Sequence, residues 1–310
     1  MRYRFVTADV FTDTPFGGNP LAVLSDAAGI TDAAMQAIAR EFNLSETVFV
    51  LPPDDPTHTR RLRIFTPARE VPFAGHPTVG SALVLAWLGE IDLAGATTRI
   101  VFEEGAGPVP VTIRAEAGRA VFAELAAPVA PEVRTAPDAA ALAALLGLSE
   151  ADLRGDAGLP AACSCGLPFL IVELRDAAAL GRARLDRARW QELLADAWAR
   201  EVLVVTRDAA DVGADFRVRM FAPAAGIEED PATGSAAAAL GGWLGLREAT
   251  GDGTYRYAIA QGLEMGRPSR LEVAVERRAG QVAAVRVGGR AVPISEGTIE
   301  VPDHLRHRGD

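Results

Sequence analysis

Two carboxylates and one imidazole lie beside small residues in this sequence, and these groups could carry chemistry. Glu46 precedes an apolar run, and His76 directly follows Gly75. Asp230 precedes Gly234 in the stretch GIEEDPATGSAAAAL. Such side chains can remove a proton from a substrate and return it. Each also has an ordinary explanation, because Glu46 could be a solvated strand-edge charge, His76 a packed imidazole and Asp230 a helix cap. The residues alone nominate candidates without choosing among them.

Small residues also mark two expected helix starts. A helix start offers unpaired N–H groups and the positive end of the helix dipole, so it attracts anions. Gly75, Gly234 and Ser235 would let a ligand approach that backbone closely. The alanine-rich helix from Ala236 to Leu240 could pass through a barrel interior, because its side chains are small. The alternative is that the glycines only allow tight turns. We expect the two starts to bind an anionic group.

The two helix starts lie in a repeated segment. The stretch RIFTPAREVPFAGHPTVGSALVLAWLG, residues 63–89, is similar to RMFAPAAGIEEDPATGSAAAALGGWLG, residues 219–245. Arg, Phe, Pro and Ala recur in register, and both copies end on Trp-Leu-Gly. A three-residue shift between these ends aligns Ala74-Gly75-His76 with Thr233-Gly234-Ser235. Two unrelated strand-turn-helix units could share these residues, but agreement at both ends favours duplication. A cleft between duplicated halves is a usual place for a small-molecule site.

The elements around these motifs predict an α+β protein. The segment 31–43 predicts a helix with Met35, Ile38 and Phe42 on one face. The segments 135–153 and 186–200 are expected to be helical, and FLIVEL and EVLVVT to be short buried strands. The last sixty residues alternate as antiparallel strands. At 310 residues, two domains are expected rather than one.

Composition excludes several classes of protein. A formal net charge of -10 and a pI near 5.0 disfavour a nucleic-acid surface. Every basic residue is Arg, so Schiff-base chemistry, pyridoxal phosphate attachment and the P-loop lysine are excluded. The apolar runs end well short of the about 18 residues that a membrane span needs. The first residues lack a secretory apolar region. We expect a cytoplasmic protein that binds neither membrane nor nucleic acid.

Cysteine and histidine usage predicts neither a disulfide nor a metal site. Cys163 and Cys165 are too close together to staple a fold and too few for a structural zinc, so they are expected to be reduced thiols. His304 and His307 lie in a polar tail with no helical metal-ligand pairing. The stretches FGGNP and GAGPVP lack the strand-glycine-helix arrangement of a nucleotide-binding loop. No cofactor is expected.

Five motifs occur along nearly the whole chain in a fixed order: DVFTDTPFGGNPLAVL, EFNLSETVFV, FTPAREVPFAGHPTVGSALVL, EEDPATGSAAAAL and QGLEMGRPS. They resemble the signatures of the PhzF-like phenazine biosynthesis family, cofactor-independent isomerases related to diaminopimelate epimerase. The resemblance implies a diaminopimelate epimerase-like fold of two pseudo-symmetric domains. Each would be a β-barrel around a central α-helix, with the active site in the cleft between them. We expect an N-terminal barrel at 1–120, a C-terminal barrel at 121–295, and a last strand at about 296–310 that returns to the first barrel.

The resemblance also implies an activity and its residues. The characterised member isomerises trans-2,3-dihydro-3-hydroxyanthranilate by moving a proton within its ring system. Its acid/base is the Glu of the Ser-Glu-Thr motif, which corresponds to Glu46. One carboxylate can remove, hold and return a proton where water is excluded, and an apolar neighbourhood such as TVFV favours its protonated form. The family's substrate contacts correspond to His76, Asp230 and Ser235, and we expect Ser45, Gly75, Thr233 and Gly234 to bind substrate beside them.

Relatives that racemise or epimerise amino acids use two thiols, one at each helix start. By the motif alignment Ala74 and Thr233 occupy those places, so two-thiol epimerisation is not expected. We therefore expect a one-base isomerase of a small cyclic or conjugated acid, active as a homodimer. The alternative is a non-catalytic small-molecule-binding or interaction protein with the same fold. The residues name neither the substrate nor a phenazine pathway.

Overall fold

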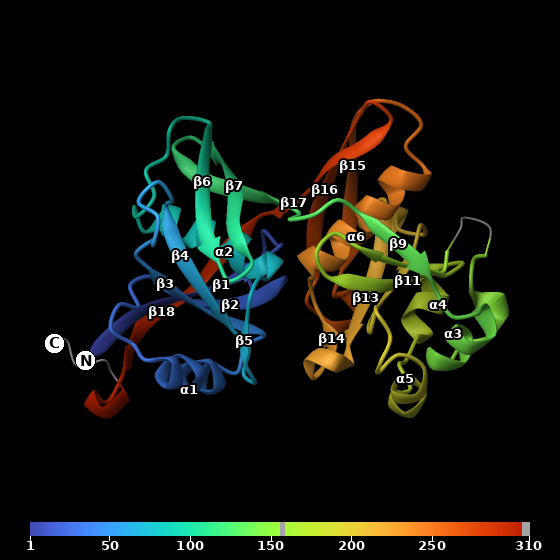
Figure 1. Cartoon of the computed structure of the whole chain (residues 1–310), viewed down its shortest axis with the longest axis horizontal. Coiled ribbons are helices and arrows are strands. Elements are labelled where there is room, and N and C mark those ends of the chain that lie inside the picture. The colour runs from blue at the N-terminus through green and yellow to red at the C-terminus, as the bar shows by residue number, and fades with distance from the viewer. Residues whose placement is uncertain (156–158, 306–310) are drawn as a thin grey trace. The chain divides into compact units, whose positions relative to one another are not determined.

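The computed structural model describes residues 1–155 and 159–305 (Figure 1). The chain divides into two compact units. The first unit consists of Met1–Ala126 and Gly288–Asp310, and the second of Ala127–Val287. None of the helices in the described part of the chain is long and apolar enough to cross a membrane.

Nine strands form a mixed sheet in the described residues of the first unit. Strand β1 pairs antiparallel with both β2 and β18, and β2 pairs parallel with β3. The pairing continues antiparallel from β3 to β4, parallel from β4 to β6, and antiparallel through β7 to β8, while the short β5 pairs with β4. The strands are β1 (Arg2–Val10), β2 (Asn19–Leu24), β3 (Glu46–Leu51), β4 (Arg60–Phe65), β5 (Glu70–Val71), β6 (Thr97–Glu104), β7 (Gly107–Glu116), β8 (Arg119–Ala126) and β18 (Ala291–Glu300).

A buried helix, α2 (Gly75–Trp87), runs inside this sheet. It contacts β1, β2, β3, β7, β8 and β18, so strands surround it. Its residues from Gly75 to Leu85 are all buried, which suits a helix that is apolar on every side. A Cβ at Gly80 would lie 2.5 Å from Cδ2 of Leu21, so the helix and β2 need a glycine there.

A second helix of the first unit, α1 (Asp32–Phe42), lies on the outer face of the sheet. Thr31 caps its start, and Asn43 ends it in the left-handed conformation at φ 50°. Met35 and Ile38 pack in one cluster with Phe49 of β3. The helix and the buried face expected from the sequence are confirmed.

The second unit repeats the strand order of the first. Strands β9, β10 and β11 pair antiparallel, and β11 pairs parallel with β12. Strand β13 then pairs antiparallel with β12 and β14 and parallel with β15, which pairs antiparallel with β16. The strands are β9 (Glu132–Thr135), β10 (Ala161–Ser164), β11 (Pro168–Glu173), β12 (Glu201–Thr206), β13 (Phe216–Ala222), β14 (Ile227–Asp230), β15 (Gly253–Gln261), β16 (Ser269–Arg278) and β17 (Gln281–Gly289).

The central helix of the second unit is α6 (Gly234–Arg247), which contacts β10, β11, β15 and β16. Its small residues are required by packing. A Cβ at Gly241 would lie 2.5 Å from Cγ1 of Val273, and one at Gly242 would lie 2.5 Å from Sγ of Cys165. The alanines and glycines of this helix therefore allow the surrounding strands to approach it closely, as the sequence predicted.

Three short helices cover the outer face of the second unit, namely α3 (Ala139–Leu145), α4 (Ala177–Arg182) and α5 (Arg187–Leu193). The expected helices at 135–153 and 186–200 are therefore too long. Gly147, at φ 65°, follows the end of α3. After α5 the chain folds back, and the indole of Trp190 donates to the carbonyl of Arg200 at 2.8 Å. Single 3-10 turns occupy Glu150–Asp152, Ala210–Val212, Pro223–Ala225, Leu263–Met265 and Asp303–Leu305.

The repeated sequence forms the same structure in both units. Arg63 in β4 binds Glu70 through two contacts of 2.7 and 2.6 Å, and its guanidinium lies 5.2 Å from the ring centre of Phe65. Arg219 in β13 binds Glu229 through contacts of 2.8 and 2.7 Å, and lies 5.0 Å from the ring centre of Phe221. Each hairpin leads into its central helix. The sequence repeat is therefore a structural duplication.

Candidate functional site

Glu46 and His76 lie together in the first unit. Glu46 is the first residue of β3, and it shares a strand face with Val48, opposite the face on which Phe49 packs against α1. This places its carboxylate toward α2, whose second residue is His76. The distance from Nε2 of His76 to Oε2 of Glu46 is 3.4 Å, and the two side chains are 6% and 15% exposed.

Burial controls the charge of this imidazole. Removal from water lowers the pKa of His76 from 6.5 to about 3, because burial disfavours the imidazolium. His76 is therefore neutral near pH 7, so its contact with Glu46 is not an ion pair there. A neutral imidazole can donate a hydrogen bond to a carboxylate or accept one from a carboxylic acid, so it suits either charge state of the neighbouring group.

The central helices begin without side-chain caps. The residues before them, Ala74 and Thr233, are extended and make no side-chain cap hydrogen bond. The outer helices differ, since α1, α3, α4 and α5 are all capped by a hydroxyl or carboxylate. The first N–H groups of α2 and α6 thus lack both an intrahelical acceptor and a cap. Such groups can bind an anion.

A hydrogen-bonded network forms the start of α6 in the second unit. The hydroxyl of Thr233 donates to the carboxylate of Asp230, which explains why it does not cap the helix. Gln261, at the end of β15, donates from Nε2 to the carbonyl of Asp230 at 2.7 Å and to Oγ1 of Thr233 at 3.1 Å. Its Oε1 accepts from the N–H of Thr233 at 3.1 Å. The network fixes the Asp230 carboxylate beside Gly234 and Ser235.

Gln261 was not among the residues nominated from the sequence. It is 1% exposed, and its amide makes three contacts with the segment before α6. A signal was present, because it is the first residue of the quoted motif QGLEMGRPS. A buried Gln at the end of a strand needs polar partners, and this could have placed it at the site.

The eight nominated residues fall into two groups. The first unit brings together Ser45, Glu46, Gly75 and His76, at the start of β3 and of α2. The second unit brings together Asp230, Thr233, Gly234 and Ser235, at the end of β14 and the start of α6. His304 lies in the turn Asp303–Leu305, apart from both groups in the sequence, and His307 lies outside the described residues.

The two cysteines are packed rather than reactive. Both are free and buried, and burial raises the pKa of each to about 12. Cys165 donates to the carbonyl of Ala238, in the body of α6. The positions directly before the two central helices hold Ala74 and Thr233, so neither cysteine lies there.

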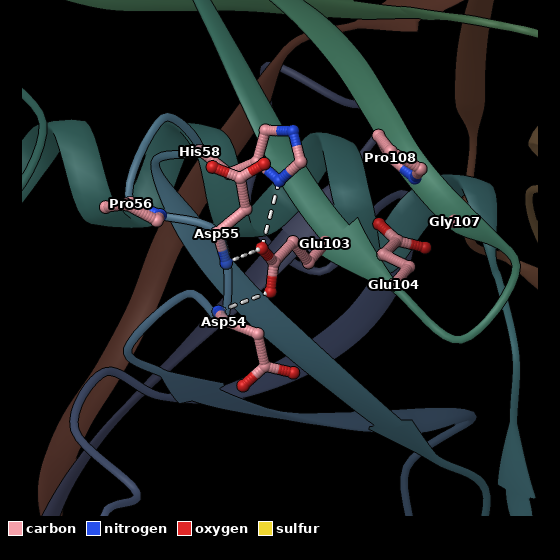
Figure 2. A pocket seen from close by; sticks show the side chains of 8 residues that line it. All are labelled: Asp54, Asp55, Pro56, His58, Glu103, Glu104, Gly107 and Pro108. Atoms are coloured by element: carbon pink, nitrogen blue, oxygen red, sulfur yellow. Dashed lines mark hydrogen bonds and ion pairs between the residues drawn. The ribbon is translucent and has the colours of Figure 1, made fainter.

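A separate acidic hollow of about 720 Å³ occurs in the first unit (Figure 2). Glu103 organises it, because its carboxylate accepts the N–H groups of Asp54 and Asp55 and lies 2.9 Å from Nδ1 of His58. The residues around it do not include Glu46 or His76, and their negative charge does not suit an anion. Across residues 1–155 and 159–305 no group of three or more His, Cys, Asp or Glu side chains could hold a metal ion.

Known proteins are similar to this chain in sequence. The family model for phenazine biosynthesis-like proteins (PhzC–PhzF) matches residues 8–297. An uncharacterized isomerase of Mesorhizobium japonicum is 44% identical, over 96% of this chain and 98% of its own length. The trans-2,3-dihydro-3-hydroxyanthranilate isomerase of Pseudomonas aeruginosa is 34% identical, over 95% of this chain and 98% of its own length.

Solved structures agree as well. A phenazine biosynthesis protein of the PhzF family from Bacillus anthracis superposes with a TM-score of 0.87 at 26% identity, over 97% of this chain and 100% of its own. A probable proline racemase from Agrobacterium radiobacter shares the fold alone, with a TM-score of 0.62 at 16% identity over 97% and 93% of the two chains. The diaminopimelate epimerase-like fold is confirmed. The chain belongs to the PhzC–PhzF family of phenazine biosynthesis-like proteins and is an isomerase of that family.

Proposed function

We propose that the chain moves a proton between carbon atoms of a small cyclic or conjugated carboxylic acid, with Glu46 as the single acid/base and without a cofactor. The contact between Glu46 and His76 carries the proposal. A carboxylate with a side-chain exposure of 15% lies 3.4 Å from a buried neutral imidazole, at the uncapped start of α2. This arrangement can take a proton from carbon, hold it away from water and return it.

In this proposal the other groups of the site bind the substrate. The first N–H groups of α2, beside Glu46, hold an anionic group of the substrate, such as its carboxylate. Asp230, held by Thr233 and Gln261, and the half-buried Ser235 bind its polar groups. The negative charge that develops on the substrate when the proton leaves would be stabilised by these fixed donors.

The packing of the thiols favours this chemistry over two-base epimerisation. The residues before α2 and α6 are Ala74 and Thr233, neither of which is a nucleophilic base. Both cysteines stay protonated because burial raises the pKa of each thiol to about 12. A proton transfer in this chain would therefore use a carboxylate rather than a pair of thiolates.

Exchange with solvent tests the proposal. The purified protein would be mixed with trans-2,3-dihydro-3-hydroxyanthranilate in heavy water and followed by proton NMR, because that compound is the substrate that names the Pseudomonas aeruginosa relative. Isomerisation by the wild type is expected, with Glu46→Gln slowed at least about 100-fold while it still binds the compound. A matched control is Glu41→Gln, which changes an exposed carboxylate of α1 five residues away and should keep the wild-type rate.

A near-normal rate for Glu46→Gln would remove Glu46 from the mechanism. Binding of the compound without any change in its carbon-bound hydrogens would count against the proposed reaction on this compound, and would favour a different substrate or a binding role. A homodimer and a cytoplasmic location stay predictions, which sedimentation and cell fractionation would test.

A further inference from the structure

Glu104 is a buried carboxyl group that the proposed chemistry does not use. It is the last residue of β6, and it is 7% exposed. Its Oε1 lies 2.6 Å from the hydroxyl of Thr78, in the first turn of α2. That hydroxyl also lies 2.8 Å from the carbonyl of Ala74, the residue before the helix. Glu104 therefore reaches the start of α2 through one bridging hydroxyl.

The duplication gives Glu104 a counterpart. Strand β4 pairs with β6 through Arg61 and Glu103, and β13 pairs with β15 through Arg217 and Ala260. The repeat aligns Arg63 with Arg219. Two residues earlier in each strand, Arg61 is therefore equivalent to Arg217. The next residue along each parallel strand is then Glu104 in the first unit and Gln261 in the second. Both side chains contact the start of a central helix.

Counting protons assigns the charge of Glu104. A threonine hydroxyl has one proton, so Thr78 cannot donate to both Ala74 and Glu104. The carbonyl of Ala74 can only accept, so both short contacts are hydrogen bonds only if Glu104 is the donor to Thr78. Its other oxygen, Oε2, is buried and makes no hydrogen bond within the described part of the chain. A buried carboxylate with one oxygen unsatisfied would be costly, whereas a neutral carboxylic acid is less so.

We propose that Glu104 and Gln261 are equivalent positioning residues that hold the starts of α2 and α6, and that Glu104 does this as a neutral carboxylic acid. The primary amide of Gln261 donates and accepts without charge, and a protonated carboxyl has the same capability. The turn after Glu104 also holds the entry to α2, because the N–H of Ala106 donates to the carbonyl of Pro72 at 2.9 Å. The contacts made by Glu104 and Ala106 therefore hold the backbone on both sides of Gly75 and His76.

The surroundings of Glu104 agree with a neutral group. Burial raises its pKa to about 8, and only the hydrogen bond with Thr78 acts in the other direction. The neighbouring elements α2 and β7 present Thr78, Gly107 and Pro108, which do not titrate. In Figure 2, Glu104 lies apart from the contacts of Glu103. The titratable side chains that line the acidic hollow with Glu104 are Asp54, Asp55, His58 and Glu103. A second hollow that Glu104 also lines adds Arg61, Arg63 and Glu70.

The sign of the pH dependence follows from the protonation states. Glu104 keeps its proton up to about pH 8 in the folded chain, and loses it near pH 4.5 when unfolded. Its contribution to stability is complete below pH 4.5 and is lost as the pH rises through 8. Glu104→Gln puts the amide of Gln261 at this position and cannot ionise. Its thermal unfolding midpoint should match that of the wild type at pH 5 and exceed it by at least about 4 °C at pH 9.

Glu103→Gln is the matched control, because Glu103 is the adjacent carboxylate and its pKa is lowered by the N–H groups of Asp54 and Asp55. It is ionised at both pH values, so its effect on the midpoint should be the same at pH 5 and pH 9. A difference between Glu104→Gln and wild type that stays constant over this range would overturn the proposal, since it would mean that Glu104 is already ionised in the folded chain.

Two further measurements keep the proposal testable. If Glu104→Gln does not fold, Gln261→Glu places an ionisable group at the counterpart, and its midpoint should fall relative to wild type between pH 5 and pH 9. An unchanged difference would contradict the equivalence. The second measurement is of activity, and it rests on the proposed function. The kcat/KM of wild type should decline above about pH 8, and that of Glu104→Gln should decline less. Absence of turnover by wild type at any pH would count against the proposed function, and the unfolding midpoints would still decide the role of Glu104.

Discussion

At the scale of single residues, burial decides what each candidate group can do. Glu46 lies at the first position of its strand, where a solvated charge would be the ordinary expectation, yet its side chain is 15% exposed and contacts His76. His76 is buried deeply enough to lose its charge near pH 7. The pair therefore combines one group that can carry a proton with one that can hydrogen-bond to it in either direction.

The neutral imidazole of His76 leads to a prediction about acid stability. The folded chain binds a proton at His76 only near pH 3, whereas the unfolded chain binds one near pH 6.5. The stabilisation is therefore complete above pH 6.5 and is lost as the pH falls toward 3. Wild type should lose about 3 kcal/mol of unfolding free energy, relative to His76→Asn, between pH 7 and pH 4. Urea unfolding at both pH values measures this. Equal pH dependence in the two proteins would show that the pKa of His76 is the same in the folded and the unfolded chain, which would contradict the prediction.

At the scale of elements, the outer and central helices follow different rules. Each outer helix is short and capped by its own side chain, as with Thr31 before α1. The two central helices are buried over most of their length and begin uncapped. Side chains from distant strands hold the residues around their starts. A side-chain cap would occupy the first N–H groups of such a helix. Because α2 and α6 have no side-chain cap, these groups are available for a ligand.

Packing of α6 against the strands can be tested with one glycine. Gly241→Ala would place a Cβ 2.5 Å from Cγ1 of Val273, and overpacking of this kind costs about 1–3 kcal/mol. Gly181→Ala in α4 is the matched control, because a Cβ there meets nothing within 4 Å. The control should be neutral or stabilise by up to about 1 kcal/mol, since alanine favours helix. Chemical denaturation of both variants gives the comparison. If Gly241→Ala left the free energy of unfolding unchanged, β16 would have to be able to move away from the helix.

At the scale of the whole molecule, the chain enters the second unit after Ala126 and returns to the first at Gly288. Strand β18 then pairs with β1 along its length, from Arg2 with Glu300 to Val10 with Ala291. The carbonyl of Leu305 also accepts from the hydroxyl of Thr31 at 2.7 Å, at the start of α1. The first unit is thus closed by a segment distant in sequence, while the second unit is continuous.

Truncation after Val287 tests this closure. Without β18, strand β1 loses one of its two partners and α2 loses one of the strands that cover it. Amides of β1 and β2 should lose protection from hydrogen exchange, while those of β11 and β12 should keep it. Hydrogen exchange with mass spectrometry of full-length and truncated chains would show the pattern. Retained protection in β1 would mean that β18 is dispensable for the first unit.

Much of this molecule could be predicted from local sequence. The helix from Asp32 to Phe42, the repeat around Arg63 and Arg219, and the small residues of α6 all follow from periodicity, caps and spacing. The motifs also determined the family and the candidate residues. The lengths of α3 and α5 were overestimated, because an apolar and alanine-rich run does not reveal where tertiary packing folds the chain back.

Only the tertiary structure decided which residues meet. Glu46 and His76 are separated in sequence by β4 and β5. Glu104 and Gln261 reach the helix starts from the ends of strands that pair in parallel across a crossover. Local patterns carry no information on such pairing, since the register of distant strands sets it. Burial likewise depends on the complete fold, and it is burial that makes His76 neutral and holds Glu104 in its protonated form.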